Sequence, residues 1–337
     1  MLKIKRINLK DKQSLTYLGE YIAKCQNRLG AIAWEPNGKV DPWDHVESIM
    51  ALNLLDFKEE ALKGFDWLIS SQEQDGSWYS EYQGEKITNL NKETNFCAYI
   101  SSGALHHFLN FKELSFLEKI WPTLKKSIEF VISGQTDEGD ILWAKDDNEE
   151  WMDDSLLTGC ASIFKSLNDF NKIAKTLGYE EFILKEEIKN LKDSIINKSE
   201  RFDRTWESKA RYSMDWYYPV LCGIHNKQDS KKIINERWDE FVVPGLGCKC
   251  VSEEPWVTVA ESCELILALN KIDEKKTALE IFENISKLID QKDKLFWTGY
   301  VYKDDKFWPI EKPSWTAAAV VLAANSLFEF NSTSNFF

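Results

Sequence analysis

The sequence lacks an excess of basic residues. Its 337 residues include 42 Lys and Arg against 55 Asp and Glu, which gives a formal net charge of −13 at pH 7. Nucleic-acid binding requires a basic surface, and so does docking on an anionic lipid surface. The composition therefore predicts a protein that binds neither nucleic acid nor a membrane.

Long apolar runs are also absent. No window approaches the roughly 18 apolar residues of a transmembrane helix, and the first residues, MLKIKRINLKDK, lack the apolar stretch of a signal peptide. The seven cysteines are odd in number and scattered, which favours reduced thiols. Cys248 and Cys250 are the one close pair, and a single C-x-C is a weak metal signal. We expect a cytoplasmic protein without a metal or a cofactor.

A linker rich in glycine, serine or proline is missing as well. Hydrophobic residues make up 43% of the chain and charged residues 29%, which is ordinary for a protein that buries a core. We therefore expect one domain over residues 1–337, with its repeated units at about 14–330. The most charged stretch, 185–204, is expected to form one exposed outer helix. The oligomeric state is left open.

Tryptophan, by contrast, is abundant and recurs in a pattern. The chain has 14 Trp, and most follow an amphipathic segment and a polar turn. The clearest copy spans 61–78 (ALKGFDWLISSQEQDGSW), and 127–143 and 281–297 repeat it. Between these breaks apolar residues recur at helical rather than strand spacing, and 316–330 is apolar nearly all round.

Six such helix pairs predict an all-α fold, an (α/α)6 barrel with outer amphipathic and inner apolar helices. The inner helices are expected to begin near DPWD at 41–44, NFCA at 95–98, WMDD at 151–154, MDWY at 214–217, TVAE at 258–261 and PSWT at 313–316. Loops from outer to inner helices all emerge at one end of such a barrel. The aromatic and acidic residues of these loops are therefore expected around one mouth.

Aromatic residues beside carboxylates are typical of a sugar-binding cleft. Sugar rings stack their C–H faces on aromatic side chains, and their hydroxyls hydrogen-bond carboxylates and amides. We predict that the mouth binds its substrate through the following residues: Trp34, Trp43, His45, Trp78, Trp151, Asp153, Asp154, Asp215, Trp216, Tyr217, Trp256, Trp297 and Trp315.

Cleavage of a glycosidic bond needs two carboxyl groups, one protonated and one ionised. Glu261 follows Val259 and Ala260, and such apolar neighbours favour the protonated form that a proton donor needs. Asp44 opens a helix whose dipole stabilises the ionised form that a base needs. We expect Glu261 to be the acid and Asp44 the base, although residue type alone allows the reverse, and either could simply cap its helix. Glu47 is the alternative to Asp44, and Glu264 is expected on another part of its helix surface.

The segment QEQDGSW at 72–78 resembles the QW motif of terpene cyclases and prenyltransferase β-subunits. The D-x-D-D acid motif of class II cyclases has its nearest match in WMDD at 151–154, where Trp stands in place of the first Asp. The D-D-x-x-D motif of ionising enzymes fails too, because Leu157 occupies its last position. No set of Asp, Cys and His resembles the zinc site of protein prenyltransferases. This resemblance therefore indicates a fold and not a chemistry.

A longer resemblance covers roughly residues 30–325. It rests on DPWDHVES at 41–48, RYSMDWYYPVL at 211–221, PGLGCKCVSEEPWVTVAESCEL at 244–265 and WTGYVYKDDKFWPIEKPSWTAAAVVLAA at 297–324. These strings are similar to bacterial proteins commonly labelled prenyltransferase-like, which accompany sugar methyltransferases and glycosyltransferases. That family includes the endomannanase-type hydrolase of mycobacterial methylmannose polysaccharide metabolism. The resemblance implies a glycoside hydrolase with Asp44 and Glu261 as its catalytic pair.

We therefore expect an inverting, endo-acting glycoside hydrolase whose substrate is an α-mannan-like or O-methylated mannose oligosaccharide or polysaccharide. Two alternatives remain. A terpene cyclase or prenyltransferase would need an apolar cavity, whereas these loops are polar. A non-catalytic sugar-binding barrel would keep the ring of Trp residues but has no need of an isolated carboxylate at 261, so Glu261→Gln would leave its function unchanged.

Overall fold

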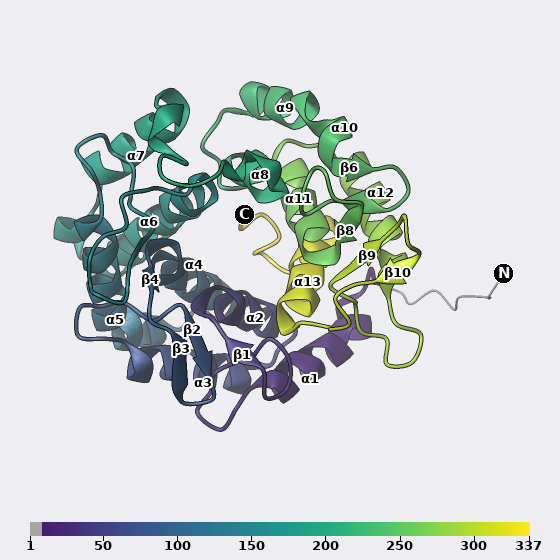
Figure 1. The fold of residues 1–337 in the computed structure, drawn as a ribbon. Helices are drawn as coiled ribbons and strands as arrows, with labels where there is room; N and C mark the ends of the chain where they lie inside the picture. The colour runs from purple at the N-terminus through teal and green to yellow at the C-terminus, as the bar shows by residue number, and fades with distance from the viewer. Residues whose placement is uncertain (1–8) are drawn as a thin grey trace.

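Helices alternate between an inner and an outer ring in residues 9–337, the part of the chain that the computed structural model describes (Figure 1). Residues 1–8, which the expected domain includes, lie outside the described part. The inner ring consists of α2 (Pro42–Leu54), α4 (Thr94–Phe111), α6 (Leu157–Leu177), α8 (Ser213–Leu221), α11 (Val259–Lys271) and α13 (Ser314–Phe328). The outer ring consists of α1 (Thr16–Cys25), α3 (Lys58–Ser71), α5 (Leu114–Ser133), α7 (Glu186–Asn197), α9 (Lys227–Glu236) with the short α10 (Trp238–Phe241), and α12 (Lys275–Ile285).

The inner ring is closed by contacts between neighbouring helices. α2 packs on α4, α4 on α6, α6 on α8, α8 on α11, α11 on α13, and α13 on α2. Every residue of α13 except Trp315 and Phe328 is buried, as its continuous apolar pattern predicts. This closure confirms the predicted all-α, (α/α)6 barrel.

The recurring Gln-rich turns join one outer helix to the next. The Gln72 side-chain amide donates to the carbonyl of Gly76 and to the carbonyl of Thr123 on α5, at 2.9 Å each. Gly76 has φ +94, and a Cβ there would lie 2.2 Å from the carbonyl oxygen of Lys126 on α5. Only glycine fits so close to a neighbouring backbone. Equivalent amide bonds are made by Gln26 and Gln135, so the sequence repeat fixes the spacing of the outer ring.

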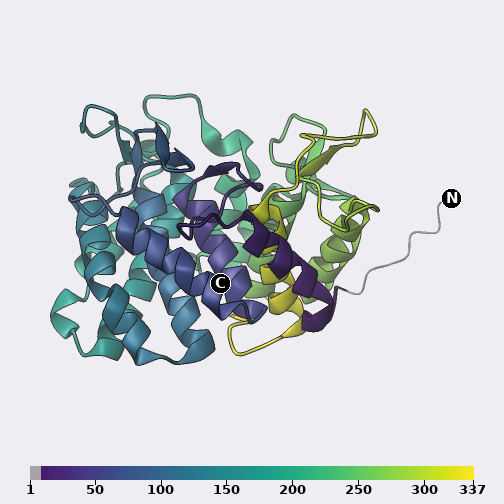
Figure 2. The same cartoon turned by 90° about the horizontal axis from the view of Figure 1, so that it is seen from below.

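Short antiparallel strands occupy the connections from outer to inner helices. One sheet joins β1 (Lys39–Val40), β2 (Glu81–Gln83) and β3 (Lys86–Asn89), and another joins β8 (Trp256–Thr258), β9 (Gly299–Val301) and β10 (Lys306–Phe307). Two further pairs are β4 (Lys92–Glu93) with β5 (Ala144–Lys145), and β6 (Val242–Val243) with β7 (Gly247–Cys248). Figure 2 shows the hairpins rising at one end of the barrel, at the top of that view. This end is the mouth.

Two expected boundaries differ from the structure. The inner helix expected from 151–154 begins at Leu157, because residues 151–154 are held in an irregular loop by a bridge to Lys145 and by side-chain hydrogen bonds. The charged stretch 185–204 contains one exposed helix as expected, but α7 ends at Asn197 and a short 3-10 turn follows.

The last residues close the opposite end of the barrel. After α13 the chain turns back toward the centre of the ring (Figure 1). The ring of Phe336 lies edge-on to His106 on α4, with centroids 5.0 Å apart. Phe337 lines a small interior cavity together with Glu47, Glu264 and other side chains.

Candidate active site

Asp44 lies in the first turn of α2, at the mouth of the barrel. Asp41 is the N-cap of this helix and accepts the backbone N–H of Asp44 at 2.8 Å, while Pro42 fits the first helical position. The Asp44 side chain is 8% exposed, and its Oδ2 atom is buried without a hydrogen-bond partner. The local sequence DPWD thus places a carboxyl with a free oxygen at the helix start.

Burial, together with the neighbouring charges of Asp41 and Glu47, raises the pKa of the Asp44 carboxyl well above its usual range. Asp41 is the better place for a negative charge, since it accepts the Asp44 N–H and lies near the Lys39 ammonium. Burial thus opposes the helix dipole, which was expected to keep Asp44 ionised, and favours the protonated form of this carboxyl.

Glu261 occupies the equivalent first turn of α11 and is 6% exposed. Strand β8 runs directly into this helix, and the hydroxyl of Ser262 bridges the Cys248 N–H and the Thr258 carbonyl. The thiol of Cys250 hydrogen-bonds the Glu261 carboxylate, and burial with the Glu261 charge raises the pKa of that thiol. Glu261 thus has a hydrogen-bond donor, the Cys250 thiol, as its neighbour. Asp44, by contrast, has another carboxyl, that of Asp41, as its neighbour.

Two further carboxyls lie one turn deeper in the barrel. Glu264 accepts hydrogen bonds from the hydroxyls of Tyr217 and Tyr218 on α8. Burial and the charge of Glu47 raise the pKa of Glu264 well above its usual range. The expectation that Glu264 lies on another part of the helix surface is wrong. Spacing of three residues puts it below Glu261 on the inward face, a signal that the sequence already contained.

Glu47 faces the same interior from α2. It accepts the hydroxyl of Tyr99 at 2.9 Å and the indole N–H of Trp315 at 2.8 Å, and burial raises the pKa of Glu47 to about 7. Trp43, a predicted binding residue, is buried in the core and is stacked on Tyr99 with ring centroids 4.5 Å apart, so it supports the barrel wall. Neither Tyr99 nor Tyr218 was selected from the sequence, because a tyrosine in apolar helical text is typical of a core.

Aromatic side chains lie at or near the connections from outer to inner helices. Trp34 and Trp315 are both half-buried, with ring centroids 6.0 Å apart. Trp256 is half-buried against Trp308, and Trp297 is half-buried and stacked on Phe307 at 5.4 Å. Trp34, Trp256, Trp297 and Trp315 therefore keep part of their surface accessible, as substrate binding requires.

Besides Trp43, four predicted binding residues lie in the core. Trp78 is fully buried, and its indole N–H donates to the Leu68 carbonyl. His45 is fully buried, with its ring nitrogens bonded to the backbone of Ile32 and Gly64. Trp216 and Tyr217 are buried as well, the first bonded to the Ile233 carbonyl and the second to Glu264. These expectations are corrected: each side chain supports the barrel wall.

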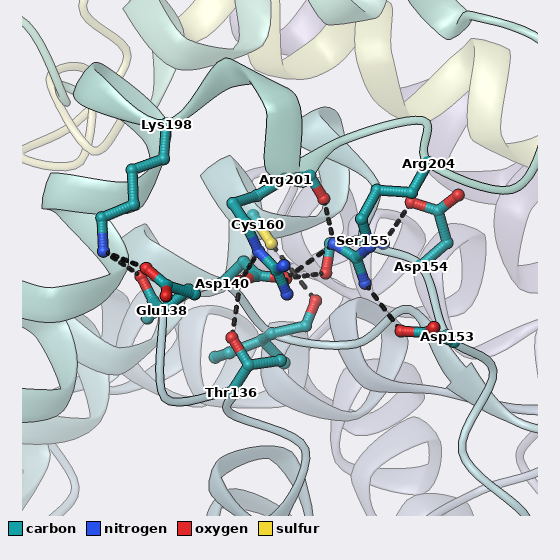
Figure 3. A network of polar contacts seen from close by, with 12 residues as sticks. Thr136, Glu138, Asp140, Asp153, Asp154, Ser155, Cys160, Lys198, Arg201 and Arg204 are labelled. Carbon is teal, nitrogen blue, oxygen red and sulfur yellow. Dashed lines mark hydrogen bonds and ion pairs between the residues drawn. The ribbon is translucent and has the colours of Figure 1, made fainter.

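Asp153 and Asp154 belong to a polar network that ties the loop before α6 to the chain after α7 (Figure 3). Arg204 bridges Asp153 and the fully buried Asp140, at 3.2 and 3.1 Å. Asp154 is fully buried and accepts the Thr205 N–H at 2.6 Å. Asp154 therefore positions the loop before α6 instead of binding substrate. The exposed Asp153 supports the same loop through its ion pair with Arg204.

The two remaining predictions have different outcomes. Trp151 is half-buried and packs on the outer helix α5, with its ring 5.5 Å from that of Phe130, so this helix covers part of its surface. Asp215 lies in the first turn of α8 and accepts both the N–H and the hydroxyl of Thr158 on α6. Burial raises the pKa of Asp215 to about 6. Asp215 is 8% exposed and remains a candidate at the mouth.

Neither a membrane span nor a metal cluster is found in residues 9–337. No helix there combines the length and apolarity needed to cross a bilayer. No group of three or more His, Cys, Asp or Glu residues in that part of the chain is arranged to hold a metal ion. The absence of a cofactor stays a prediction.

Comparison with known proteins gives one sequence relative and several structural ones. The chain is 42% identical over 306 residues to the MMP endo-(1,4)-3-O-methyl-alpha-D-mannosidase of Mycolicibacterium hassiacum, a match that covers 91% of this chain and 84% of the relative. No family model matches, so the prenyltransferase-like grouping stays a prediction.

Solved structures share the fold at low identity. A D-mannose isomerase superposes with a TM-score of 0.74 at 12% identity, covering 97% of this chain and all of that one. A glycosidase variant in complex with glucose gives 0.71 at 12% identity, with 95% and 99% covered. An alpha-amylase from Clostridium perfringens gives 0.66 at 10% identity, with 93% and 97% covered. At these identities the likeness concerns the fold alone.

Proposed function

The chain belongs to the family of the mycobacterial MMP endo-(1,4)-3-O-methyl-alpha-D-mannosidase and is a glycoside hydrolase, and we propose that it cleaves within a (1,4)-linked α-mannose chain carrying 3-O-methyl groups. The observation that carries the proposal is the placement of Asp44 and Glu261. Both carboxyls lie in the first turns of inner helices at the same mouth, and both are more than nine-tenths buried. Partly exposed tryptophans lie in the connections at that mouth.

We propose that Asp44 is the proton donor and Glu261 the base. Asp44 lies against a second carboxyl, and burial together with that neighbouring charge raises its pKa, which favours the protonated form that a proton donor needs. It donates that proton to the glycosidic oxygen as the bond to the anomeric carbon breaks. Glu261, which accepts the Cys250 thiol in the free protein, takes a proton from the water that attacks the opposite face. This order reverses the one expected from the sequence.

The attack of water on the face opposite the leaving group inverts the anomeric centre. Such a mechanism needs room for the water, which corresponds to a carboxyl separation of about 6.5–9.5 Å in inverting glycosidases. Asp44 and Glu261 come from α2 and α11, which both pack on α13, so one inner helix lies between them. Glu47 and Glu264 lie below the pair, where the hydroxyls of three tyrosines and the Trp315 indole hydrogen-bond them and hold the polar floor of the site in place.

The test uses (1,4)-linked α-mannose oligosaccharides with and without 3-O-methyl groups, beside β-mannan and α-glucan. Products are followed by mass spectrometry, and the new anomer by NMR during the first turnovers. Asp44→Asn and Glu261→Gln should each lower the rate by about 10²- to 10⁴-fold. Asp273→Asn is the matched control, because this residue is exposed and its left-handed backbone suits Asn. A rate that survives in either variant would remove that residue from the pair.

The roles of the two carboxyls are separated by the leaving group. An activated aryl α-mannoside needs no proton on its leaving oxygen, so Asp44→Asn should recover much of its rate on that substrate, while Glu261→Gln should not. Recovery of Glu261→Gln instead would restore the order expected from the sequence. Cleavage of none of the mannosides by the unaltered protein would refute the proposed function.

The same proposal extends to the setting of the enzyme. We propose that residues 1–337 form one domain, supported by a single hydrophobic cluster that runs from Leu9 to Leu327. The net charge of −13 supports a neutral saccharide rather than nucleic acid as its partner. All seven cysteines are free thiols, six of them buried, which supports a cytoplasmic location.

A further inference from the structure

The segment between β10 and α13 exposes two large apolar side chains close together in sequence. Trp308 is 56% exposed and Ile310 is 75% exposed. Every other tryptophan in residues 9–337 is buried or half-buried. A single exposed apolar residue needs no explanation. An exposed indole that lies beside a second indole, at the mouth of a sugar-cleaving barrel, does need one.

The backbone holds the two indoles in a fixed arrangement. The indole N–H of Trp256 donates to the Trp308 carbonyl at 2.7 Å, and the two rings lie edge to face with centroids 5.1 Å apart. The Trp308 N–H donates to the carbonyl of Gly299 at 3.0 Å. A Cβ on Gly299 would lie 2.4 Å from the indole nitrogen of Trp256, so glycine is required for that ring to fit. The pair is therefore ordered before any ligand arrives, which lowers the entropic cost of binding.

This indole pair is directly connected to both sides of the candidate site. Strand β8, which carries Trp256, runs into the helix of Glu261, and Cys250 bonds the Trp256 carbonyl through its N–H and Glu261 through its thiol. On the other side, residues 308–313 lead into α13, whose Trp315 bonds Glu47. In Figure 2 the β9–β10 hairpin rises at the mouth end. Trp308, which directly follows β10, thus lies at the mouth end of the barrel.

We propose that Trp308, supported by Trp256, is an outlying subsite that stacks on one sugar unit of the substrate, remote from the cleaved bond. The inference rests on the proposed function, because an endo-acting enzyme holds several units on each side of that bond. The apolar C–H face of a hexose matches an indole face, and an O-methyl group adds apolar surface that Ile310 can contact. The occupant is one unit of an O-methylated hexose chain.

The test compares kcat/KM on O-methylated α-mannose oligosaccharides of increasing length. In the unaltered protein, kcat/KM should rise until the chain reaches Trp308. Trp308→Ala should abolish that gain, so that kcat/KM on long chains falls about five- to tenfold. Its kcat should be unchanged, and its kcat/KM on short chains should equal that of the unaltered protein. Trp308→Phe should retain part of the gain. Leu114→Ala is the matched control, since Leu114 is 45% exposed at the start of an outer helix, away from the mouth.

The outcomes separate this inference from the proposed function. If the unaltered protein cleaves these chains and Trp308→Ala keeps the full gain with length, the subsite is refuted while the hydrolase stands. If the unaltered protein cleaves none of them, the proposed function fails, and the subsite is judged by calorimetric binding to a panel of long glycans. Weaker binding by Trp308→Ala would then support it, and equal binding would refute it.

Discussion

Asp215 is a buried carboxyl at the start of α8, and its replacement by Asn tests whether burial governs the acidic residues of the mouth. Its Oδ1 accepts the N–H and the hydroxyl of Thr158, and burial nevertheless raises its pKa from 3.8 to about 6. A raised carboxyl pKa means that the folded state favours the protonated form. Asn resembles that form in shape and can accept the same two hydrogen bonds.

The magnitude follows from the pKa values. A rise of about two units, at 1.36 kcal/mol per unit, corresponds to about 3 kcal/mol between the two protonation states. The stabilisation from the protonated group is complete below the unfolded pKa of 3.8 and is lost as the pH rises through about 6. The ionised side chain therefore costs the folded protein about 1 kcal/mol at pH 4.5 and about 3 kcal/mol at pH 8.

Asp215→Asn should consequently be more stable than the unaltered protein, and its advantage should grow by about 2 kcal/mol between pH 4.5 and pH 8. Urea unfolding of both proteins at the two pH values measures this difference. Other buried carboxyls titrate over the same pH range and affect both proteins alike. The informative quantity is therefore the difference in unfolding free energy between the variant and the unaltered protein at each pH. Asp153→Asn serves as the control for loss of a carboxylate at the surface, because its side chain is 90% exposed.

A destabilised Asp215→Asn at pH 8, or an advantage that stays constant between the two pH values, would refute the reasoning. The same variant also reports on function. If Asp215 contacts the substrate, KM should rise although the protein is more stable, a combination that a purely structural residue would not give.

Three further predictions concern the mouth and its supports. Asp41→Asn keeps the helix cap but removes a negative charge beside Asp44, so the pKa of Asp44 should fall. The alkaline limb of the pH profile of kcat/KM should therefore move to lower pH. A limb that does not move would contradict the proposal that Asp44 is the acid. Trp78→Ala should destabilise the fold by about 3–5 kcal/mol in urea unfolding, because this side chain is fully buried. Sugar affinity measured below the unfolding transition should not change, and a selective loss of affinity would return Trp78 to the binding site. Asp140→Asn leaves Arg201 and Arg204 without their shared carboxylate and should lower the unfolding free energy by several kcal/mol. Limited proteolysis should then cut first in the chain after α7, which these two arginines anchor. A first cut elsewhere would contradict this anchoring role.

Much of the fold could be predicted because the necessary signals are local. Apolar residues at helical spacing specify amphipathic and buried helices, and the repeated Gln and Gly turns specify where one outer helix meets the next. The start of α2 could be placed for the same reason, since Asp41 and Pro42 form a recognisable N-cap. The start of α6 could not, because WMDD at 151–154 resembles a helix start but is bound by Thr205, about fifty residues away in the sequence.

The sequence by itself determined the barrel, the side of the barrel on which the loops emerge, and the presence of Asp44 and Glu261 in the first turns of inner helices. The tertiary structure decided which aromatic side chains face the solvent and which carboxyls face the interior. Trp78 and Trp308 both lie in outer-to-inner connections, yet one is fully buried and the other is 56% exposed. The reason is physical: helical periodicity is set by neighbours within one or two turns. Burial, and with it the protonation of a carboxyl such as Asp44, depends on which distant segments pack around it.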